Sequence, residues 1–337
     1  MSITSALYGM KSLIGSKLLV TLPVTEAGPD IFEQVFIVTG ANGGLGFESS
    51  LHLSRLGVGR LILGVRSLAK GEDAKKRIID TTGQPPSTIE VWPLDMDSYD
   101  SVKAFANRVS IQLPRLDGVL YNAGVMTTQW SLSEGYEKTL NVNFISTFLL
   151  YMLLLPKMRE SGKATGHACR FVIPNSALYN MAPLAELDPD KNPSIIERLN
   201  NEKTADMSGR YPLSKLLVLF AVRELFARSS ATGKEDVIIN TPNPSFCKSN
   251  LAHESADSSA FKVFEKILAR SAEEGSRVLV HGLLAGPETN GQYLSNCRIE
   301  IPRCQVTGKW GQRVQKKLVD ELLEELNKIQ PCITTGL

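Results

Sequence analysis

Residues 35–46 read VFIVTGANGGLG, and this stretch decides the fold. Its first four residues form an apolar run typical of a buried strand, and a helical pattern follows from residue 44 to residue 56. Glycines between a strand and a helix allow a tight turn and let the backbone approach a phosphate at the positive helix N-terminus. The stretch therefore predicts a dinucleotide-binding loop, with these residues against the pyrophosphate: Gly40, Asn42, Gly43, Gly44, Leu45 and Gly46.

Short β-rich runs alternate with longer helical patterns along the rest of the chain. This alternation predicts an α/β fold: a Rossmann-type, doubly wound parallel sheet of about seven strands in a single domain, with helices on both faces. The expected strands span residues 35–38, 60–65, 89–92, 118–121, 170–173, 237–241 and 292–294. The expected helices span residues 44–56, 69–81, 99–113, 134–154, 211–227, 271–284 and 312–327.

The alternating pattern occupies residues 33–310, preceded by an extension, residues 1–32, and followed by a C-terminal helix and tail, residues 311–337. Apolar residues recur in the extension at helical spacing, but Lys11 and Lys17 make it too charged and too short to span a bilayer. We expect a surface helix packed on the domain, with a membrane-surface anchor or a substrate lid as alternatives.

Composition narrows the range of partners. The formal net charge is only +2 and no dense block of Lys and Arg is present, so nucleic acid is not an expected partner. The five cysteines are scattered and the four histidines are isolated, which favours reduced thiols in a cytoplasmic protein and predicts no metal site.

Arg66 follows the second expected strand, where an NAD site offers an acidic residue to the ribose 2′-hydroxyl. A guanidinium there can bind the 2′-phosphate of NADP and stack on adenine, and the next acidic residue is Glu72. Arg66 therefore favours NADP(H), and Lys70 is assigned to the same site.

Turn residues after other strands complete the predicted cofactor site. Asp95 can accept a hydrogen bond from the adenine amine, and small residues after Asn122 let the backbone lie flat beside the cofactor. The residues assigned on this basis are Asp95, Met96, Asn122, Ala123, Gly124, Pro244, Ser245 and Phe246.

Tyr211 and Lys215 stand four residues apart at the start of a helical pattern, so their side chains share a face. A phenol, with a reference pKa of about 10, needs a nearby cation to serve as an acid–base catalyst near neutral pH, and Lys215 supplies one. Ser176, just past the fifth expected strand, offers a hydroxyl that can polarise a carbonyl. Asn143 is expected to hold a water that links Lys215 to solvent.

In this order, the glycine loop, the Asn-Ala-Gly turn, Asn143, Ser176 and the Tyr211–Lys215 pair resemble the short-chain dehydrogenase/reductase family over roughly residues 33–295. Residues 63–72 and 286–293 are similar to its retinol-dehydrogenase-like branch, especially the fungal members in secondary metabolism. The resemblance implies a Ser-Tyr-Lys-Asn tetrad in which Tyr211 moves the proton and Lys215 also binds the nicotinamide ribose.

Three features depart from the family pattern. The usual paired serines are Asn175 and Ser176, preceded by Pro174, and the usual glycine after Pro244 is Ser245, which places a side chain close to the nicotinamide. The separation of Ser176 from Tyr211 is also long, which predicts a large substrate site.

Two segments, residues 177–210 and 242–270, are expected to be irregular loops that face the substrate at the carboxyl ends of the strands. The predicted pocket wall is partly apolar and consists of Met126, Tyr179, Asn180, Met181, Phe246 and Cys247. Family members often pair through helices at positions 99–113 and 134–154, so a monomer and a homodimer both remain open.

These features favour an NADPH-dependent carbonyl reductase, or the reverse alcohol dehydrogenase, that acts on a largely apolar small molecule such as a secondary-metabolite intermediate. Asn175 and Ser245 leave open a second hypothesis, in which the same fold serves a biosynthetic isomerase, epimerase or cyclase. A third hypothesis, a cofactor-binding protein without catalysis, is disfavoured because all four tetrad positions are filled.

Overall fold

The computed structural model describes residues 20–191, 193–234, 236–247 and 269–337. Its strands are β1 (Val35–Thr39), β2 (Arg60–Val65), β3 (Ile89–Pro93), β4 (Gly118–Leu120), β5 (Leu132–Ser133), β6 (Tyr136–Glu137), β7 (Cys169–Val172), β8 (Val237–Asn243), β9 (Tyr293–Ser295) and β10 (Arg298–Ile299). Its helices of the α class are α2 (Gly44–Arg55), α3 (Leu68–Thr82), α4 (Tyr99–Gln112), α5 (Lys138–Leu140), α6 (Ser146–Thr165), α7 (Ile195–Leu199), α8 (Arg210–Ala231), α10 (Ala272–Leu284), α11 (Cys304–Thr307) and α12 (Lys309–Ile329).

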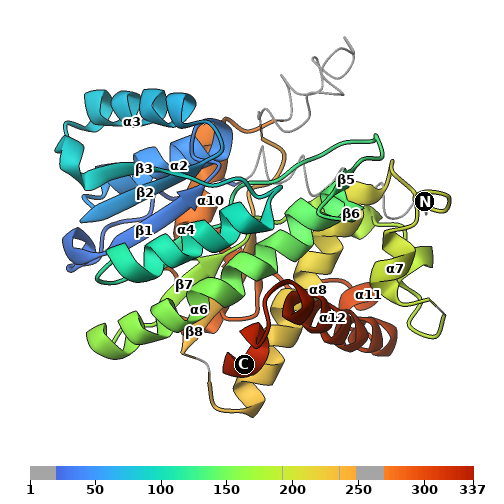
Figure 1. Ribbon diagram of the computed structural model, residues 1–337. Helices are drawn as coiled ribbons and strands as arrows, with labels where there is room; N and C mark the ends of the chain where they lie inside the picture. The colour runs from blue at the N-terminus through green and yellow to red at the C-terminus, as the bar shows by residue number, and fades with distance from the viewer. Residues whose placement is uncertain (1–19, 192, 235, 248–268) are drawn as a thin grey trace, which may run out of the picture.

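The main sheet has eight strands in the order β10-β9-β8-β7-β4-β1-β2-β3 (Figure 1). Neighbouring strands are parallel, except that β10 runs antiparallel to β9. The predicted doubly wound parallel sheet is therefore confirmed. The chain moves outward from β1 to β2 and β3 and then returns to β4 on the other side of β1, which opens a crevice at the carboxyl ends of these strands.

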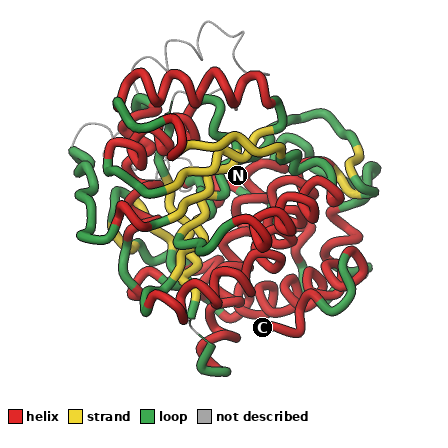
Figure 2. Tube along the Cα trace, turned by 60° about the vertical axis from the view of Figure 1, so that its left-hand side comes forward, coloured by secondary structure: helices red, strands yellow, loops and turns green. Residues whose placement is uncertain are grey.

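Helices cover both faces of the sheet, and Figure 2 shows the strands running between two groups of helices. On one face α2, α3 and α10 pack on the strands, and on the other face lie α4, α6 and α8. Along β1, Phe36 and Val38 enter the core on the side of α2 and α10, while Val35 and Ile37 enter the core on the side of α4, α6 and α8. This alternation explains why the strand reads as a continuous apolar run, since both of its faces are buried.

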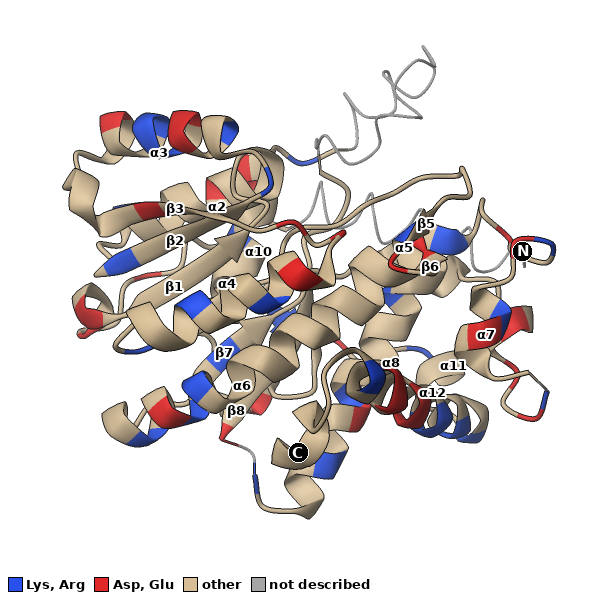
Figure 3. Cartoon of the chain, in the orientation of Figure 1, with Lys and Arg blue, Asp and Glu red and all other residues tan. Residues whose placement is uncertain are grey.

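Charged residues of both signs lie interspersed on α3, α7 and α12, at the outside of the fold (Figure 3). Among the described residues, one helical stretch, Lys138–Thr165, is long and apolar enough to cross a membrane. Of its most apolar window 89% is buried inside the fold, so this stretch is the core helix that packs against α4 and the sheet.

The helix expected over residues 134–154 is wrong at both ends. Glu134 and Gly135 have φ values of 53° and 85°, which build the two-residue turn of the β5–β6 hairpin. Helical structure begins only at Lys138 and passes through a π-helical turn, Asn141–Ile145. It then continues to Thr165 through Pro156, because most side chains of the helix are buried and their packing stabilises it.

A second hairpin adds β10, a strand of the main sheet that was not expected. Asn296 and Cys297 have φ values of 52° and 59° and turn the chain from β9 into β10. This turn contains no glycine, so the usual hairpin signal is absent from the sequence.

Much of the segment expected to be an irregular loop over residues 177–210 is ordered structure. It contains two 3-10 turns, Ala177–Met181 and Ala185–Leu187, and the short helix α7. The carboxylate of Glu321 on α12 accepts hydrogen bonds from the main-chain N–H groups of Ile195 and Ile196, at 3.1 and 2.9 Å. The C-terminal helix therefore anchors this segment, whereas residues 248–268 of the second expected loop lie outside the described residues.

The helical expectation for the N-terminal extension also falls mainly outside the described part, which begins at residue 20. From there to the 3-10 turn Ile31–Glu33 the chain forms no helix or strand. Leu22 is buried, and its carbonyl oxygen accepts a hydrogen bond of 2.9 Å from Nη1 of Arg277 on α10.

His52 on α2 generates a prediction about stability. Burial is the main cause that lowers the pKa of His52, although Glu273 opposes the shift. The unfolded chain therefore binds a proton more readily than the folded protein as the pH falls through about 6.5, and stability is lost in that window. We expect His52→Gln to flatten the decrease in the free energy of unfolding between about pH 7.5 and 5.5, measured by urea denaturation. An unchanged slope would contradict this assignment.

Candidate active site

The glycine loop lies between β1 and α2. Gly40 takes a φ of +63°, and its N–H donates to the carbonyl oxygen of Gly64 on β2 at 2.8 Å. A side chain at Gly46 would collide with the carbonyl oxygen of Gly40 and come within 2.5 Å of Nδ2 of Asn122. The first turn of α2 therefore lies directly against the loop, with its unpaired N–H groups available to an anion.

Asn122 joins the ends of the two strands at the crevice. Its Nδ2 donates to the carbonyl oxygens of Thr39 and Gly40, at 3.2 and 3.3 Å, and the N–H of Ala123 donates to Oγ1 of Thr39 at 2.9 Å. These bonds hold β4 beside β1 while leaving the edges of both loops open. The predicted contact residues Asn122 and Ala123 therefore also maintain the shape of the loop.

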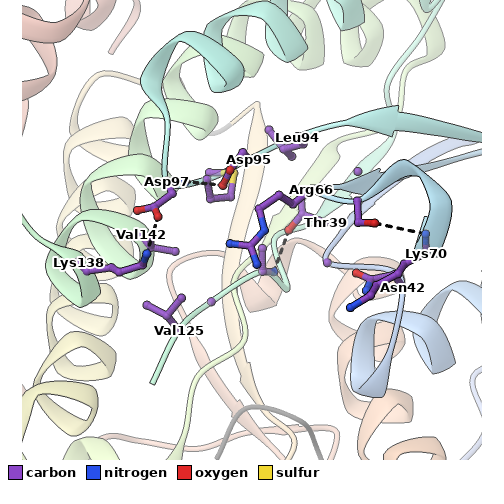
Figure 4. A pocket seen from close by; sticks show the side chains of 16 residues that line it. Thr39, Asn42, Arg66, Lys70, Leu94, Asp95, Asp97, Val125, Lys138 and Val142 are labelled. Atoms are coloured by element: carbon purple, nitrogen blue, oxygen red, sulfur yellow. Dashed lines mark hydrogen bonds and ion pairs between the residues drawn. The ribbon is translucent and has the colours of Figure 1, made fainter. Parts of the chain in front are cut away.

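A pocket of about 270 Å³ opens at the carboxyl ends of β1, β2 and β3 (Figure 4). Of the predicted cofactor residues it is lined by Gly40, Asn42, Arg66, Lys70, Asp95, Met96, Ala123 and Gly124. Residues that the sequence did not single out also line it: Thr39, Gly64, Ser67, Leu94, Asp97, Val125, Lys138 and Val142. The pocket offers the hydrogen-bond donors and cations that an adenosine and its phosphates need.

Arg66 is an exposed cation of this pocket, and in Figure 4 its side chain extends across the opening. No hydrogen bond or ion pair to another described residue engages its guanidinium. Ser67 caps α3 and accepts a hydrogen bond of 3.5 Å from the N–H of Lys70, which places the Lys70 side chain at the same rim. Two cations at the end of β2 favour a bound anion.

The ion pair on the opposite wall of the pocket has no signal in the sequence. Nζ of Lys138 lies 2.6 Å from Oδ2 of Asp97, and Ser133 Oγ donates to the carbonyl oxygen of Asp97 at 3.0 Å. The pair exists because the β5–β6 hairpin returns the chain to the loop after β3. The Lys138–Asp97 pair could not be predicted as long as residues 134–154 were expected to form one helix.

Tyr211 and Lys215 lie in the first turns of α8, outside this pocket. Nζ of Lys215 donates to the carbonyl oxygen of Pro174 at 2.8 Å and lies 5.5 Å from the centre of the Tyr211 ring. Burial lowers the pKa of Lys215 to about 8 and raises the pKa of Tyr211 above its ordinary value. At neutral pH the pair is thus a protonated phenol beside an ammonium, which suits donation of a proton.

Asn143 lies in the π-helical turn before α6. Its Oδ1 accepts from the N–H of Val125 at 2.9 Å, and its Nδ2 donates to Val125 O at 2.8 Å and to Ser214 Oγ at 3.1 Å. The side chain therefore connects the loop after β4 with α8, and π-helical turns of this kind are frequent at functional sites. The expected water between Asn143 and Lys215 stays a prediction.

Ser176 follows β7 and is partly exposed. Its Oγ accepts a hydrogen bond of 3.2 Å from the N–H of Leu178, at the start of the turn Ala177–Met181. The hydroxyl keeps its own proton for another acceptor. The four tetrad residues therefore come from three segments at the carboxyl edge of the sheet: the loop after β7, the π-helical turn and the first turns of α8.

One residue of the predicted substrate wall, Tyr179, needs a correction. Tyr179 is buried, with 2% of its surface exposed, and its ring packs against Tyr293 in the core at 5.3 Å. Cys247 donates from Sγ to Pro244 O at 3.2 Å, and its side chain packs against α10 at Gly275. The other predicted wall residues, Met126, Asn180, Met181 and Phe246, are partly exposed.

Comparison with known proteins shows which proteins the chain resembles. Residues 34–167 match the family model described as short chain dehydrogenase. The chain is similar to the short chain dehydrogenase/reductase dmxR8 of Cryptosporiopsis sp. (strain 8999), with 39% identity over 90% of this chain and 93% of that one. It is also similar to the short chain dehydrogenase atnD of Emericella nidulans, with 41% identity over 78% of this chain and 83% of that one.

Solved structures show the same fold at lower identity. A putative short chain dehydrogenase from Escherichia coli CFT073, complexed with NADPH, has a TM-score of 0.58 and 20% identity, and the match covers 79% of this chain and 98% of that chain.

Ser245, next to the site, generates a prediction about backbone strain. Its φ is 68°, a conformation that costs a residue with a side chain about 1–2 kcal/mol. Ser245→Gly is expected to raise the free energy of unfolding by up to about 1 kcal/mol, because part of the relief is offset by the greater freedom of glycine in the unfolded chain. Chemical denaturation measures this change.

The control is the same substitution at Ser229, which lies within α8 and has an ordinary φ. Ser229→Gly is expected to lower the free energy of unfolding by about 0.5 kcal/mol. A loss of stability in both variants would show that Ser245 is not strained.

Proposed function

Since the chain belongs to the short-chain dehydrogenase/reductase family, whose members are nicotinamide-dependent oxidoreductases, we propose that it is an NADPH-dependent reductase of a carbonyl group in a largely apolar small molecule. The same site can run the reaction in reverse as an alcohol dehydrogenase. The observation that carries the proposal is the pair formed by buried Tyr211 and partly buried Lys215, which lies at the same sheet edge as the glycine loop.

The residues of the crevice fit a dinucleotide. The bare backbone at Gly46 leaves the N-terminus of α2 open to a pyrophosphate, and any side chain there would fill the cradle. Arg66 and Lys70 suit the 2′-phosphate of NADP, and the E. coli structure named above was solved with NADPH. NADP(H), when bound, supplies or accepts the hydride.

The chain's own residues handle the proton and the carbonyl. Tyr211 donates its phenolic proton to the carbonyl oxygen, and its raised pKa keeps that proton in place at neutral pH. The ammonium of Lys215 stabilises the phenolate that remains. Ser176 donates a hydrogen bond to the same carbonyl oxygen and so fixes the carbonyl next to Tyr211.

The substrate class is inferred from the relatives and from the wall residues. The relatives compared above are fungal short-chain dehydrogenases, and in fungi such enzymes fit the tailoring of secondary metabolites. Met126, Met181 and Phe246 are partly exposed near the tetrad segments, and such side chains suit an apolar ligand better than a charged one.

Replacement of Tyr211 tests the proposed chemistry. Tyr211→Phe removes the proton donor without a change in ring size, and kcat is expected to fall by about 10²–10⁴-fold while NADPH still binds. NADPH oxidation with extracts or a ketone panel, read by absorbance and mass spectrometry, measures the loss.

Tyr151→Phe is the matched control, because Tyr151 is also buried but lies in the core between α6 and the sheet. It is expected to keep the activity of the unaltered enzyme. Normal turnover by Tyr211→Phe would overturn the proposal.

Replacement of Arg66 tests the choice of cofactor. Arg66→Ala removes a charge-assisted contact worth about 1.5–3 kcal/mol, so KM for NADPH is expected to rise by about 10–100-fold while KM for NADH changes little. Steady-state kinetics with each cofactor provides the measurement. Arg55→Ala, at an exposed position near the end of α2 outside the pocket, is expected to change neither value. An equal rise in KM for both cofactors would refute a contact with the 2′-phosphate.

A further inference from the structure

We infer that Asn175 is a positioning residue, whose carboxamide holds Ser176 and Lys215 in the relative placement that proton transfer by Tyr211 requires. The inference rests on the proposed function, since it concerns the same reaction. The described hydrogen bonds of the Asn175 side chain run to the main chain of Ser176 and Lys215 and to Thr241, so it acts through the residues to which it is bonded.

Three hydrogen bonds of the Asn175 carboxamide carry the inference. Nδ2 donates to the carbonyl oxygen of Lys215 at 3.2 Å and to Oγ1 of Thr241 at 3.0 Å. Oδ1 accepts from the N–H of Ser176 at 2.8 Å. One buried amide, with 3% of its surface exposed, thus binds the main chain of two tetrad residues that come from different elements.

The peptide unit before Asn175 is held in one orientation. Its carbonyl group, that of Pro174, accepts from Nζ of Lys215 at 2.8 Å, and its N–H group, that of Asn175, donates to Pro242 O at 2.7 Å. Thr241 supports the arrangement from β8, because its Oγ1 donates to Ile173 O at 2.7 Å. The carboxamide therefore fixes both the segment that carries Ser176 and the acceptor of the Lys215 ammonium.

No smaller or charged residue can make all three bonds. Serine has a single hydroxyl proton and a shorter reach, aspartate lacks the two donors, and alanine leaves the Ser176 N–H without this partner. Chemistry depends on such placement, because a misplacement of about 1 Å can lower the rate by about 10²-fold. We therefore expect loss of Asn175 to affect kcat more than ligand binding.

Asn240 provides a matched control on β8. It is an asparagine with no exposed surface, and its Nδ2 donates to Gly282 O at 2.9 Å and to Thr289 Oγ1 at 3.2 Å. Neither of these side-chain bonds reaches a tetrad residue. Asn240→Ala therefore removes the same chemical group from a core position of comparable burial, without an effect on Ser176 or Lys215.

The test compares Asn175→Ala, Asn175→Ser and Asn240→Ala in the full-length protein. Asn175→Ala is expected to lower kcat by about 30–100-fold, with KM for the carbonyl substrate within threefold and Kd for NADPH within twofold of the unaltered values. Asn175→Ser restores part of the hydrogen bonding, so its kcat is expected to lie about 3–10-fold below that of the unaltered enzyme. Amide hydrogen exchange over residues 173–178 is expected to accelerate in Asn175→Ala and to stay unchanged in Asn240→Ala.

Each outcome decides the inference. An unchanged kcat in Asn175→Ala, or an equal loss of kcat in Asn240→Ala, would overturn it, since the role would then be absent or merely structural. Should Asn175→Ala fail to fold, Asn175→Ser takes its place, and a normal kcat there overturns the inference. Failure of the proposed function is separate: the unaltered protein would then show no NADPH-dependent carbonyl reduction that Tyr211→Phe abolishes.

Discussion

The close contact between the first turn of α2 and the loop after β1 sets the geometry on which the rest of the site depends. Because Gly46 has no side chain, its backbone can lie against the carbonyl oxygen of Gly40 and beside the Asn122 amide. That amide in turn bonds both Thr39 and Gly40, so α2, β1 and β4 meet at one point. The crevice, the exposed N–H groups of α2 and the positions of Arg66 and Asp95 relative to them all follow from this junction.

The strands of the central sheet could be predicted because they are buried on both faces, which imposes a continuous apolar run that is easy to recognise. The two hairpins could not be predicted with the same confidence. Glu134 and Asn296 carry side chains into positive φ, and such conformations are decided by the strands they connect more than by the turn residues themselves. The ordered segment around α7 was missed for a related reason, since Glu321, 125 positions beyond Ile196, caps that helix.

For the site, the predicted residues that line the pocket are those whose place in the chain fixes their place in the fold. Arg66, Asp95 and Gly124 come directly after strands of a parallel sheet, so they must reach its carboxyl edge, and all three line the pocket. Tyr179 and Cys247 come from the same edge, but the sequence does not reveal which way a side chain points within a loop. The structure turns Tyr179 toward Tyr293 and Cys247 toward α10. The place of Lys138 in the pocket depends on the β5–β6 hairpin, which the local sequence pattern does not predict.

Two of the departures from the family pattern, Asn175 and Ser245, have opposite effects on the local structure, since one adds hydrogen bonds and the other holds backbone strain. Asn175 adds three hydrogen bonds in a buried place, and two of them run to the main chain of Ser176 and Lys215. Ser245 instead holds a strained backbone conformation beside the same edge, and its N–H donates to Oδ1 of Asn243 at 2.9 Å. Strain of this kind persists when the surrounding structure imposes it, and it is commonest at functional sites. The proposed acid–base centre is therefore held by hydrogen bonds on its β7 side, whereas on the β8 side Ser245 keeps a strained backbone conformation.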